Sequence, residues 1–258
     1  MDEMDEPQPK NNQIKKIVIG LVALVVIGFL LVNFNIISLG NAPQKTKMLV
    51  IGSSSEETLA VLNESKTIDY TVRTPQSLDR NPGEILAEYE IVMLDQSKEA
   101  SKEVTKALGD AVVAFVKKGG SFILVKDSGT RRPDSFDVIG WKNTFEDIIP
   151  VECDRIVNDQ PTCVNRLLIQ GKLLRKDESH PILQGIDIFP ADPSYTATFE
   201  IFDIGLTGKE IAFIERGTDG KEFIGIAEKN LVIGKSIYFN YNPGKTKGIF
   251  ESTLDYLG

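Results

Sequence analysis

A long apolar run near the amino terminus constrains this chain more than any other feature of its sequence. Residues 17–32 contain no charged side chain, and residues 36–39 extend the run after a short polar break that begins at Asn33. As a helix rising ~1.5 Å per residue, residues 17–39 are roughly 35 Å long, enough to cross a hydrocarbon core of ~30 Å. A buried helix of a soluble core would need a polar face toward water, and none exists before Asn33. The run therefore predicts a transmembrane helix over 17–39.

A cleaved signal peptide is the alternative for this segment. The apolar core of a signal peptide is ~7–15 residues long, which is shorter than this run. Pro43 would directly follow a cut after the small residue Ala42, and no cysteine lies just beyond the run to carry a lipid. We therefore expect an uncleaved signal-anchor, followed by a short linker over 40–47.

Lysines at the two ends of the run indicate its orientation. Three lysines precede the run and two follow it several residues later, and these are Lys10, Lys15, Lys16, Lys45 and Lys47. Because loops with more Lys and Arg stay in the cytoplasm, we expect residues 1–16 to form a cytoplasmic tail. Residues 48–258 then lie outside the cytoplasm, on a single-pass protein of the cell membrane.

The charge of the remaining chain limits its partners. The sequence holds 37 acidic and 29 basic residues, of which four acidic and three basic lie within 1–40, so the remainder has a formal charge of −7. No block of Lys or Arg stands out, so we expect no nucleic acid and no general anionic-lipid partner. The acidity favours solubility.

Cys153 and Cys163 are the two cysteines of the chain. In an extracytoplasmic domain, a pair ten residues apart favours a disulfide, and two buried free thiols are the alternative. A zinc site would need four N or S ligands, and the chain has a single histidine. We therefore expect no metal and no cofactor. Asn63 begins the one glycosylation sequon, which is usable only outside the cytoplasm.

The first half of the soluble part alternates strands with helices. The expected strands are 47–52, 70–72, 89–94 and 122–125. Residues 101–118 predict the clearest helix, in which Val104, Leu108, Ala111 and Phe115 form one apolar stripe and Gly119 suits the left-handed cap. Strand, helix and strand at this spacing form a right-handed βαβ unit. This half therefore predicts a flavodoxin-like, doubly wound α/β sheet.

The second half changes to antiparallel strands. Residues 211–216 and 223–227 flank the turn 217–220, which contains two glycines and predicts a hairpin. Further strands are expected over 167–169, 231–234 and 236–240, and a closing helix over 250–257. The predicted fold class is an α/β sheet with antiparallel C-terminal additions, occupying residues 48–258.

Three stretches of the chain resemble a known family. They are residues 115–123, the Ser-His-Pro-Ile-Leu-Gln-Gly-Ile motif at 179–186, and the closing strand and turn at 234–244. Together they resemble the class I glutamine amidotransferase-like fold, especially its trehalose-utilisation-type and membrane-anchored branch. Enzymes of that fold carry a Cys on a strained turn after a central strand, with a His and a Glu nearby. The matching turn here, 126–129, holds no Cys, so the resemblance implies a domain that does not hydrolyse glutamine.

Ser128 and His180 are the catalytic candidates that remain. Ser128 would be a nucleophile only with a base beside it, and His180 is the only imidazole of the chain. We interpret Ser128 as a plain loop serine and His180 as a structural residue at a turn. The alternative places His180 in a cleft with acids such as Asp127, Asp177 or Glu200.

The loop after the strand 122–125 is the expected ligand site, because open α/β sheets bind ligands at the carboxyl ends of their strands. The expected ligand-binding residues are Asp127, Ser128, Arg131 and Arg132. Two guanidiniums match a carboxylate or a phosphate, and a solvated pair of arginines is the alternative. Trp141 and Phe145 are expected to hold this loop against the body of the domain.

These features predict a membrane-anchored, extracytoplasmic, catalytically inactive amidotransferase-like domain. Its expected role is a binding or interaction module, with a protein partner in a membrane-associated complex. The alternative is a hydrolase that acts on a carbohydrate or an amide and uses Ser128 or His180 with nearby carboxylates.

Overall fold

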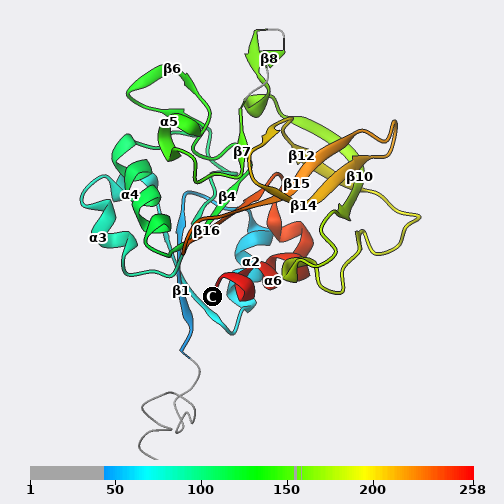
Figure 1. Ribbon diagram of the computed structural model, residues 1–258, viewed down its shortest axis with the longest axis horizontal. Coiled ribbons are helices and arrows are strands. Elements are labelled where there is room, and N and C mark those ends of the chain that lie inside the picture. Colours follow the sequence, from blue (N-terminus) through cyan, green and yellow to red (C-terminus); the bar gives the residue numbers. More distant parts are fainter. Residues whose placement is uncertain (1–43, 154–155, 158) are drawn as a thin grey trace, which may run out of the picture. The chain divides into compact units, whose positions relative to one another are not determined.

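The computed structural model describes residues 44–153, 156–157 and 159–258 (Figure 1). The chain from Lys45 to Gly258 forms one compact unit. The predicted cytoplasmic tail, the predicted transmembrane helix and the beginning of the predicted linker lie outside the described residues. Within the described ranges, no helix is both long enough and apolar enough to span a bilayer.

In the described chain, five parallel strands form one half of a ten-stranded sheet. In sheet order they are β2 (Ile68–Arg73), β1 (Thr46–Ile51), β3 (Ile91–Leu94), β4 (Ser121–Val125) and β16 (Lys235–Phe239). Strands β3 and β4 are buried along their whole length, because helices cover both faces of the sheet. The predicted strands of the first half and their parallel arrangement are confirmed.

The other half of the sheet is antiparallel. Strand β16 pairs with β15 (Glu222–Asn230), β15 with β14 (Lys209–Arg216), and β14 with β10 (Leu167–Arg175), which also pairs with β11 (Ile188–Phe189) and β12 (Ala197–Ile201). The turn between β14 and β15 holds Gly220 at a φ of 71°, as the predicted hairpin requires. The predicted antiparallel C-terminal part is therefore confirmed.

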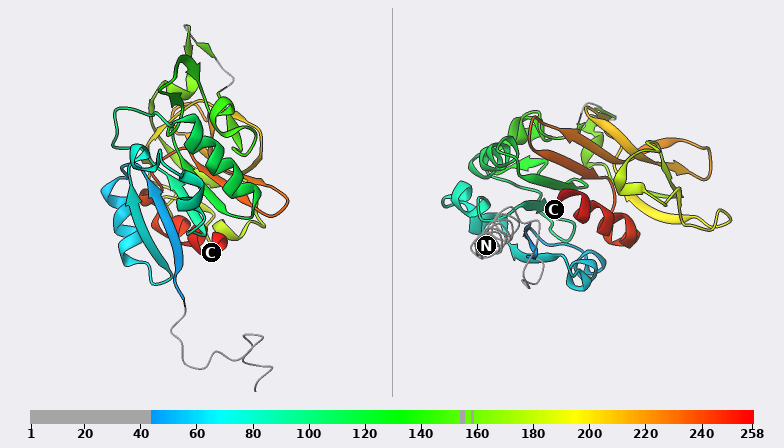
Figure 2. Two further views of the ribbon diagram at one scale, coloured as in Figure 1. Left: turned by 90° about the vertical axis from the view of Figure 1, so that its left-hand side faces the viewer. Right: turned by 60° about the horizontal axis from the view of Figure 1, so that its bottom comes forward.

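Helices cover both faces of the sheet (Figures 1 and 2). One face, the α6 face, carries α2 (Glu56–Glu64), α6 (Lys247–Leu257) and the short turns η3 (Pro181–Leu183) and η4 (Pro243–Thr246). The other, the α4 face, carries α3 (Pro82–Leu86), α4 (Lys106–Lys117) and α5 (Lys142–Phe145). Successive side chains of β1 alternate between the two cores, with Met48 on the α6 face and Leu49 on the α4 face.

Helix α4 is shorter than predicted, and its buried side differs. It begins at Lys106 after the N-cap Thr105, because the backbone N–H of Val104 donates to the carbonyl of Arg131 at 3.0 Å in a strand-like bridge. Its buried residues are Leu108, Gly109, Val112, Val113 and Val116, while Ala111 and Phe115 of the predicted stripe are only partly buried against the same core. A Cβ at Gly109 would lie 2.4 Å from the carbonyl oxygen of Thr144. The close approach of α5 therefore determines which side of α4 is buried.

Residues 231–234 form a turn between β15 and β16 and not the predicted strand. The backbone N–H of Leu231 donates to the carbonyl of Gly234 at 2.8 Å, and Val232 and Ile233 are 101% and 64% exposed. A Cβ at Gly234 would lie 1.9 Å from the carbonyl oxygen of Val116. The chain reverses here because only a glycine fits so close to the end of α4.

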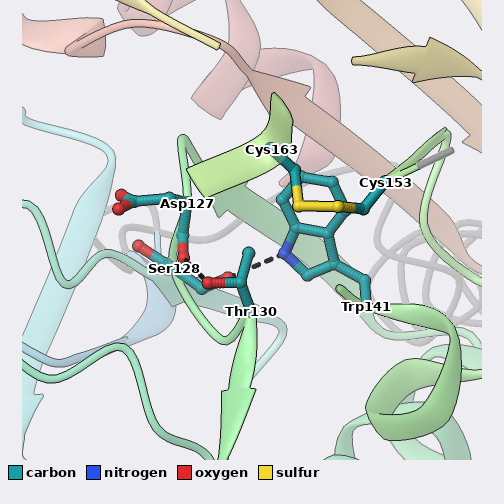
Figure 3. Close-up of a disulfide and its surroundings, with 6 residues drawn as sticks. All are labelled: Asp127, Ser128, Thr130, Trp141, Cys153 and Cys163. Carbon is teal, nitrogen blue, oxygen red and sulfur yellow. Dashed lines mark hydrogen bonds between the residues drawn. A yellow bond between two sulfur atoms is a disulfide. The ribbon is translucent and has the colours of Figure 1, made fainter. Parts of the chain in front are cut away.

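The segment between β4 and β10 consists of short elements and contains the disulfide. Its short elements are β5 (Arg131–Arg132), β6 (Ser135–Ile139), β7 (Val151–Glu152), β8 (Ile156–Val157), β9 (Gln160–Pro161) and η2 (Thr162–Val164). Trp141 and Phe145 are buried, as predicted. Cys153 and Cys163 are bonded, with their Cα atoms 5.2 Å apart. Figure 3 shows the disulfide beside the Trp141 indole, in the core of the α4 face.

Candidate functional site

The four central parallel strands end on one edge of the sheet, which we call the carboxyl edge. Their registers align Ile51 with Leu94, Leu94 with Leu124, and Val125 with Phe239. Each strand is followed at once by a polar segment, and these segments are 52–55, 95–97, 126–128 and 240–242. In open α/β sheets, ligands bind outside the carboxyl ends of the strands. The carboxyl edge is therefore the first place to look for a site.

Lys126 occupies the strained turn directly after β4. Its φ is 52°, in the left-handed region that costs a non-glycine residue ~1–2 kcal/mol. Its backbone N–H donates to the carbonyl of Phe239 at 2.7 Å, which fixes the turn against β16. Its side chain is buried, and its ammonium pairs with the carboxylate of Glu200. The position at which the amidotransferase resemblance expects a Cys therefore holds an ion-paired lysine.

Glu200 accepts from two cations. Arg166 also pairs with it, with Nη1 3.2 Å from Oε2. Burial raises the pKa of the Glu200 carboxyl, but hydrogen bonds and charge from Lys126 and Arg166 outweigh burial and lower the pKa overall. Glu200 is therefore an ionised partner of Lys126 and a poor proton acceptor.

Asp95 ends β3 as a fully buried carboxylate. Its Oδ1 accepts from the backbone N–H of Ser97 at 2.9 Å. Among the described residues, Asp95 Oδ2 and the nearby hydroxyl of Ser54 have no hydrogen bond of normal geometry. Burial raises the pKa of Asp95, and the hydrogen bonds of Ser97, the Ser54 hydroxyl and the charge of Lys126 offset part of that rise. Because buried polar groups are nearly always paired, this carboxylate has bonding capacity that the fold leaves unused.

The loop after β1 packs closely against Asp95. Gly52 has a φ of 105°, and a Cβ there would lie 2.5 Å from the carbonyl oxygen of Asp95. Glycine at this position therefore permits the loop to bring Ser54 beside the carboxylate. On the other side of the loop, the Oδ1 of Asn242 accepts from the hydroxyls of Ser55 and Thr58 at 2.9 and 2.7 Å. These bonds fix the first turn of α2 against the segment that follows β16.

Ser128 is not accessible to a substrate. It is 0% exposed, and its Oγ accepts from the backbone N–H of Gln96 at 2.8 Å. Its carbonyl accepts from Nε1 of Trp141 at 2.8 Å, as the dashed line in Figure 3 shows. Ser128 therefore connects the β3, β4 and α5 segments on the α4 face, and its hydroxyl does not point to solvent.

His180 lies on the opposite face of the sheet from Ser128. It is the N-cap of η3, where its Nδ1 accepts from the backbone N–H of Ile182 at 3.3 Å. Because Nδ1 is an acceptor, Nε2 carries the proton and donates to Glu228, 3.3 Å away. The ring packs edge-on against Tyr256 of α6, whose hydroxyl donates to the same carboxylate at 2.8 Å. The structure therefore does not bring Ser128 and His180 together, and every polar atom of the imidazole has a structural partner.

The predicted ligand-binding residues do not converge on one point. The carboxylate of Asp127 lies 3.5 Å from the ammonium of Lys102. Arg132 pairs with Asp134, and Arg131 is exposed while its backbone bonds to the segment before α4. Asp127 and Ser128 lie beside the carboxyl edge, but they are occupied by internal contacts.

The residues that do converge there, Asp95 and Lys126, were missed by sequence reasoning. The available signal was a charged residue placed directly after a wholly apolar strand, which occurs at both positions.

Two remaining predictions concern chemistry elsewhere on the molecule. Asn63 is exposed on α2, and its Oδ1 accepts from the hydroxyl of Tyr70 at 2.7 Å. Among the described residues, no group of three or more His, Cys, Asp or Glu side chains is arranged to hold a metal ion. Both cysteines are bonded to each other, so the chain has no free thiol.

Comparison with known proteins gives similarity of fold alone. No protein-family model matches the sequence, and no curated protein matches it. Among solved structures, β-galactosidase from Bacillus circulans sp. alkalophilus is similar, with a TM-score of 0.54 and 14% identity over 82% of this chain and 31% of that one. The cold-adapted β-galactosidase from Rahnella sp. R3 is similar as well, with a TM-score of 0.54 and 12% identity over 83% of this chain and 31% of that one.

A β-galactosidase from the haloarchaeon Halorubrum lacusprofundi is also similar, with a TM-score of 0.53 and 11% identity over 84% of this chain and 31% of that chain. The chain thus spans less than a third of the length of each of these proteins. The similarity shows that this chain shares a fold with a part of each of these β-galactosidases. At these identities it shows the fold and no activity.

Proposed function

We propose that residues 45–258 are a binding module without covalent chemistry, held at the membrane by the predicted helix 17–39. The observation that carries the proposal is the occupant of the strained turn after β4. A nucleophile is expected there in the amidotransferase-like enzymes, and this chain has Lys126 paired with Glu200. An ion-paired lysine is charged and has no lone pair with which to attack a carbonyl.

The neighbouring groups support the same conclusion. Ser128 is buried with its Oγ accepting from a backbone N–H, and a serine needs a base within ~3 Å to react. Glu200 has a lowered pKa, which makes it a poor proton acceptor. The hydrolase alternative, which uses Ser128 or His180 with nearby carboxylates, therefore requires Ser128 to leave its buried position or His180 to give up its present partners.

The carboxyl edge is the surface on which we place the partner. Its Asp95 carboxylate is buried with few partners, and groups whose pKa values are raised by burial concentrate at functional sites. Arg131 is exposed beside this edge and supplies a cation for a carboxylate or phosphate of the partner. The disulfide supports an extracytoplasmic location, because such bonds persist in oxidising compartments.

A turnover assay on the full chain in detergent tests the absence of chemistry. Glutamine, simple amides and p-nitrophenyl glycosides are the substrates, and circular dichroism verifies the fold of the Ser128→Ala and His180→Gln variants. We expect no turnover by any of the proteins. Hydrolysis by the natural chain that is lost in Ser128→Ala, with the fold intact, would establish the hydrolase alternative.

Site-directed photocrosslinking in native membranes tests the partner surface. A photoreactive side chain at Ser53, which is exposed on the carboxyl edge, is compared with one at Gln184, which is exposed beside η3. We expect a discrete crosslinked protein from Ser53 that is weakened by Arg131→Glu, and none from Gln184. Equal crosslinking at the two positions would remove the carboxyl edge from the proposal.

A further inference from the structure

The edge of the sheet opposite the carboxyl edge is the one at which the chain enters the domain. We call it the entry edge. The strand registers place Met48, Ile91, Ser121 and Lys235 in one row across β1, β3, β4 and β16. Neighbouring strands are ~4.8 Å apart, so the start of β16 lies about 15 Å from the start of β1. Any surface that is close to residue 45 is therefore close to the whole entry edge.

A rigid apolar turn projects from this edge. Val232 and Ile233, at the tip of the turn between β15 and β16, are 101% and 64% exposed. The turn is closed by a hydrogen bond from Leu231 to Gly234, and Gly234 packs against the backbone of α4. Single exposed apolar residues are ordinary on protein surfaces. Two adjacent branched aliphatic side chains on a fixed turn are a different feature, because they present apolar area without a cost in ordering.

The entry edge carries further apolar surface and a mixed charge. A hollow of ≈ 490 Å³ lies between α3, α4 and the starts of β3 and β4, and its walls include Ala87, Ala114 and Phe115. The exposed charged residues around it are Lys45, Lys47, Lys118, Glu88 and Glu90. Lysines and acids are both present, so the edge does not select strongly anionic lipids. The apolar turn must supply most of any attraction.

The short connection between the predicted helix and β1 limits how far the entry edge can lie from the membrane. The predicted helix ends at residue 39 and β1 begins at Thr46. Residues 40–45 span at most about 20 Å when fully extended. A bilayer that holds the helix is therefore always within reach of the entry edge. A tethered contact needs little intrinsic affinity, because the linker keeps the effective concentration high.

We propose that the Val232–Ile233 turn inserts into the interfacial layer of the bilayer that carries the anchor. The inference depends on the proposed membrane anchor. Burying these branched aliphatic side chains in an apolar environment is favourable. The contact orients the domain with its entry edge toward the lipid. The carboxyl edge, with Asp95 and Lys126, then faces away from the membrane, where a partner can reach it.

Depth-dependent fluorescence quenching tests the contact. Val232→Cys in the full chain provides one free thiol, because the two native cysteines are bonded to each other. The labelled protein is reconstituted in phosphatidylcholine vesicles with and without a lipid that carries a doxyl quencher near the headgroup. We expect a blue-shifted emission and about twofold or greater loss of fluorescence with the quencher. A label at Leu168→Cys, a position that is 72% exposed and pairs with Glu200, is the matched control and should stay unquenched.

The controls separate this inference from the anchor on which it depends. Flotation with the vesicles and resistance to alkaline carbonate show that the anchor is inserted. A chain that fails to float would contradict the anchor itself. A chain that floats, with the label at Val232→Cys no more quenched than at Leu168→Cys, would overturn the turn insertion alone. A blue shift that depends on protein density and not on the quencher lipid would assign the turn to a second copy of the chain, which also overturns it.

A second variant tests the turn without a label on it. Both side chains are exposed, so Val232→Asp with Ile233→Asp leaves the core intact. A fluorophore at Lys118→Cys, beside the turn, should be quenched by the doxyl lipid in the natural background and lose that quenching in the double variant. Unchanged quenching would show that other parts of the entry edge make the contact.

Discussion

The two edges of the parallel sheet differ in which side chains they bury and which they expose. At the carboxyl edge, polar and charged groups are buried: Asp95 is fully enclosed, and Lys126 is paired with Glu200 beneath the surface. At the entry edge, the relation is reversed, because the apolar side chains of Val232 and Ile233 are 101% and 64% exposed. The carboxyl edge therefore buries charged side chains, and the entry edge exposes apolar ones. This contrast is the basis of our proposal that both edges meet something outside the domain.

The largest expected effect comes from the close approach at the carboxyl edge. Gly52→Ala would place a Cβ 2.5 Å from the carbonyl oxygen of Asp95 at a φ of 105°. We expect a loss of about 3 kcal/mol in the free energy of unfolding, from backbone strain and overpacking together. Gly220→Ala is the control, since its φ is 71° and no atom lies within 4 Å of the added carbon. Urea denaturation of residues 45–258 gives both values, and equal losses would mean that the approach is not as close as described.

The next effect concerns the buried lysine. Lys126→Met leaves Glu200 with Arg166 as its remaining partner, and we expect a loss of about 1–2 kcal/mol after allowance for solvent around the carboxylate. The pKa of Glu200 is lowered in the folded state, so its contribution is present above its ordinary value of 4.5 and is lost as the pH falls through the folded value. The loss in the variant should thus shrink below pH 4.5.

The exposed pair of Lys117 with Glu146 provides the control for that experiment. Lys117→Met should leave the unfolding midpoint unchanged, because surface ion pairs contribute little. A comparable loss in both variants would show that the burial of Lys126 has no energetic consequence, and the contrast between the two edges would weaken.

A smaller effect of opposite sign is expected at Asp95. Burial raises its pKa above the ordinary value of 3.8, so the folded state binds the proton more tightly than the unfolded state. Stability therefore falls as the pH rises from 3.8 through the folded pKa, and the full cost is present above it. Asp95→Asn removes the charge, and we expect a gain of about 1 kcal/mol at pH 7 that disappears near pH 4. Destabilisation by Asp95→Asn at pH 7 would show that the hydrogen bonds from Ser97 and Ser54 contribute more than burial costs.

The smallest effect is expected at the entry edge. Val232→Ser with Ile233→Ser should change the free energy of unfolding in water by no more than about 0.5 kcal/mol, because exposed side chains lose nothing on truncation. Ile237→Ala, three residues beyond Gly234 and fully buried, should cost about 2–5 kcal/mol. Thermal unfolding of residues 45–258 distinguishes the two. A large loss in the double variant would mean that the turn contributes to folding and is not reserved for a contact.

Local pattern predicted the elements of the sheet well, and non-local contacts account for the errors. Strands β1, β3 and β4 are continuous apolar runs, which any chain buries on both sides. The start of α4 was missed because Val104 bonds to Arg131, a partner that no local pattern reveals. The apolar run at 231–234 has the same local pattern as a strand. The chain turns there because Gly234 packs against the end of α4.

For the candidate site, the sequence indicated a turn of the chain, and the structure shows how the side chains of that turn are occupied. Sequence reasoning placed the ligand site in the loop after β4, with Ser128 among its residues, because open α/β sheets bind ligands at the carboxyl ends of their strands. Its burial depends on Gln96 and Trp141, which lie 32 and 13 residues away in the chain. The disulfide was predicted from the spacing of the two cysteines and from the expected extracytoplasmic location of the domain. Asp95 was not selected from the sequence, because its burial depends on the packing of β1 beside β3.

The position of β16 has a consequence for how the domain is made. The sheet runs from β2 to β11, and β16 lies between β4 and β15, although it is the last strand to be synthesised. Until residue 239 has emerged, β4 and β15 each have an unpaired edge, and the parallel and antiparallel halves have no shared strand. Unpaired edges of this kind invite pairing with other chains. A growing chain therefore has two incomplete half-sheets until β16 is available, and the sheet is completed only after residue 239 has been synthesised.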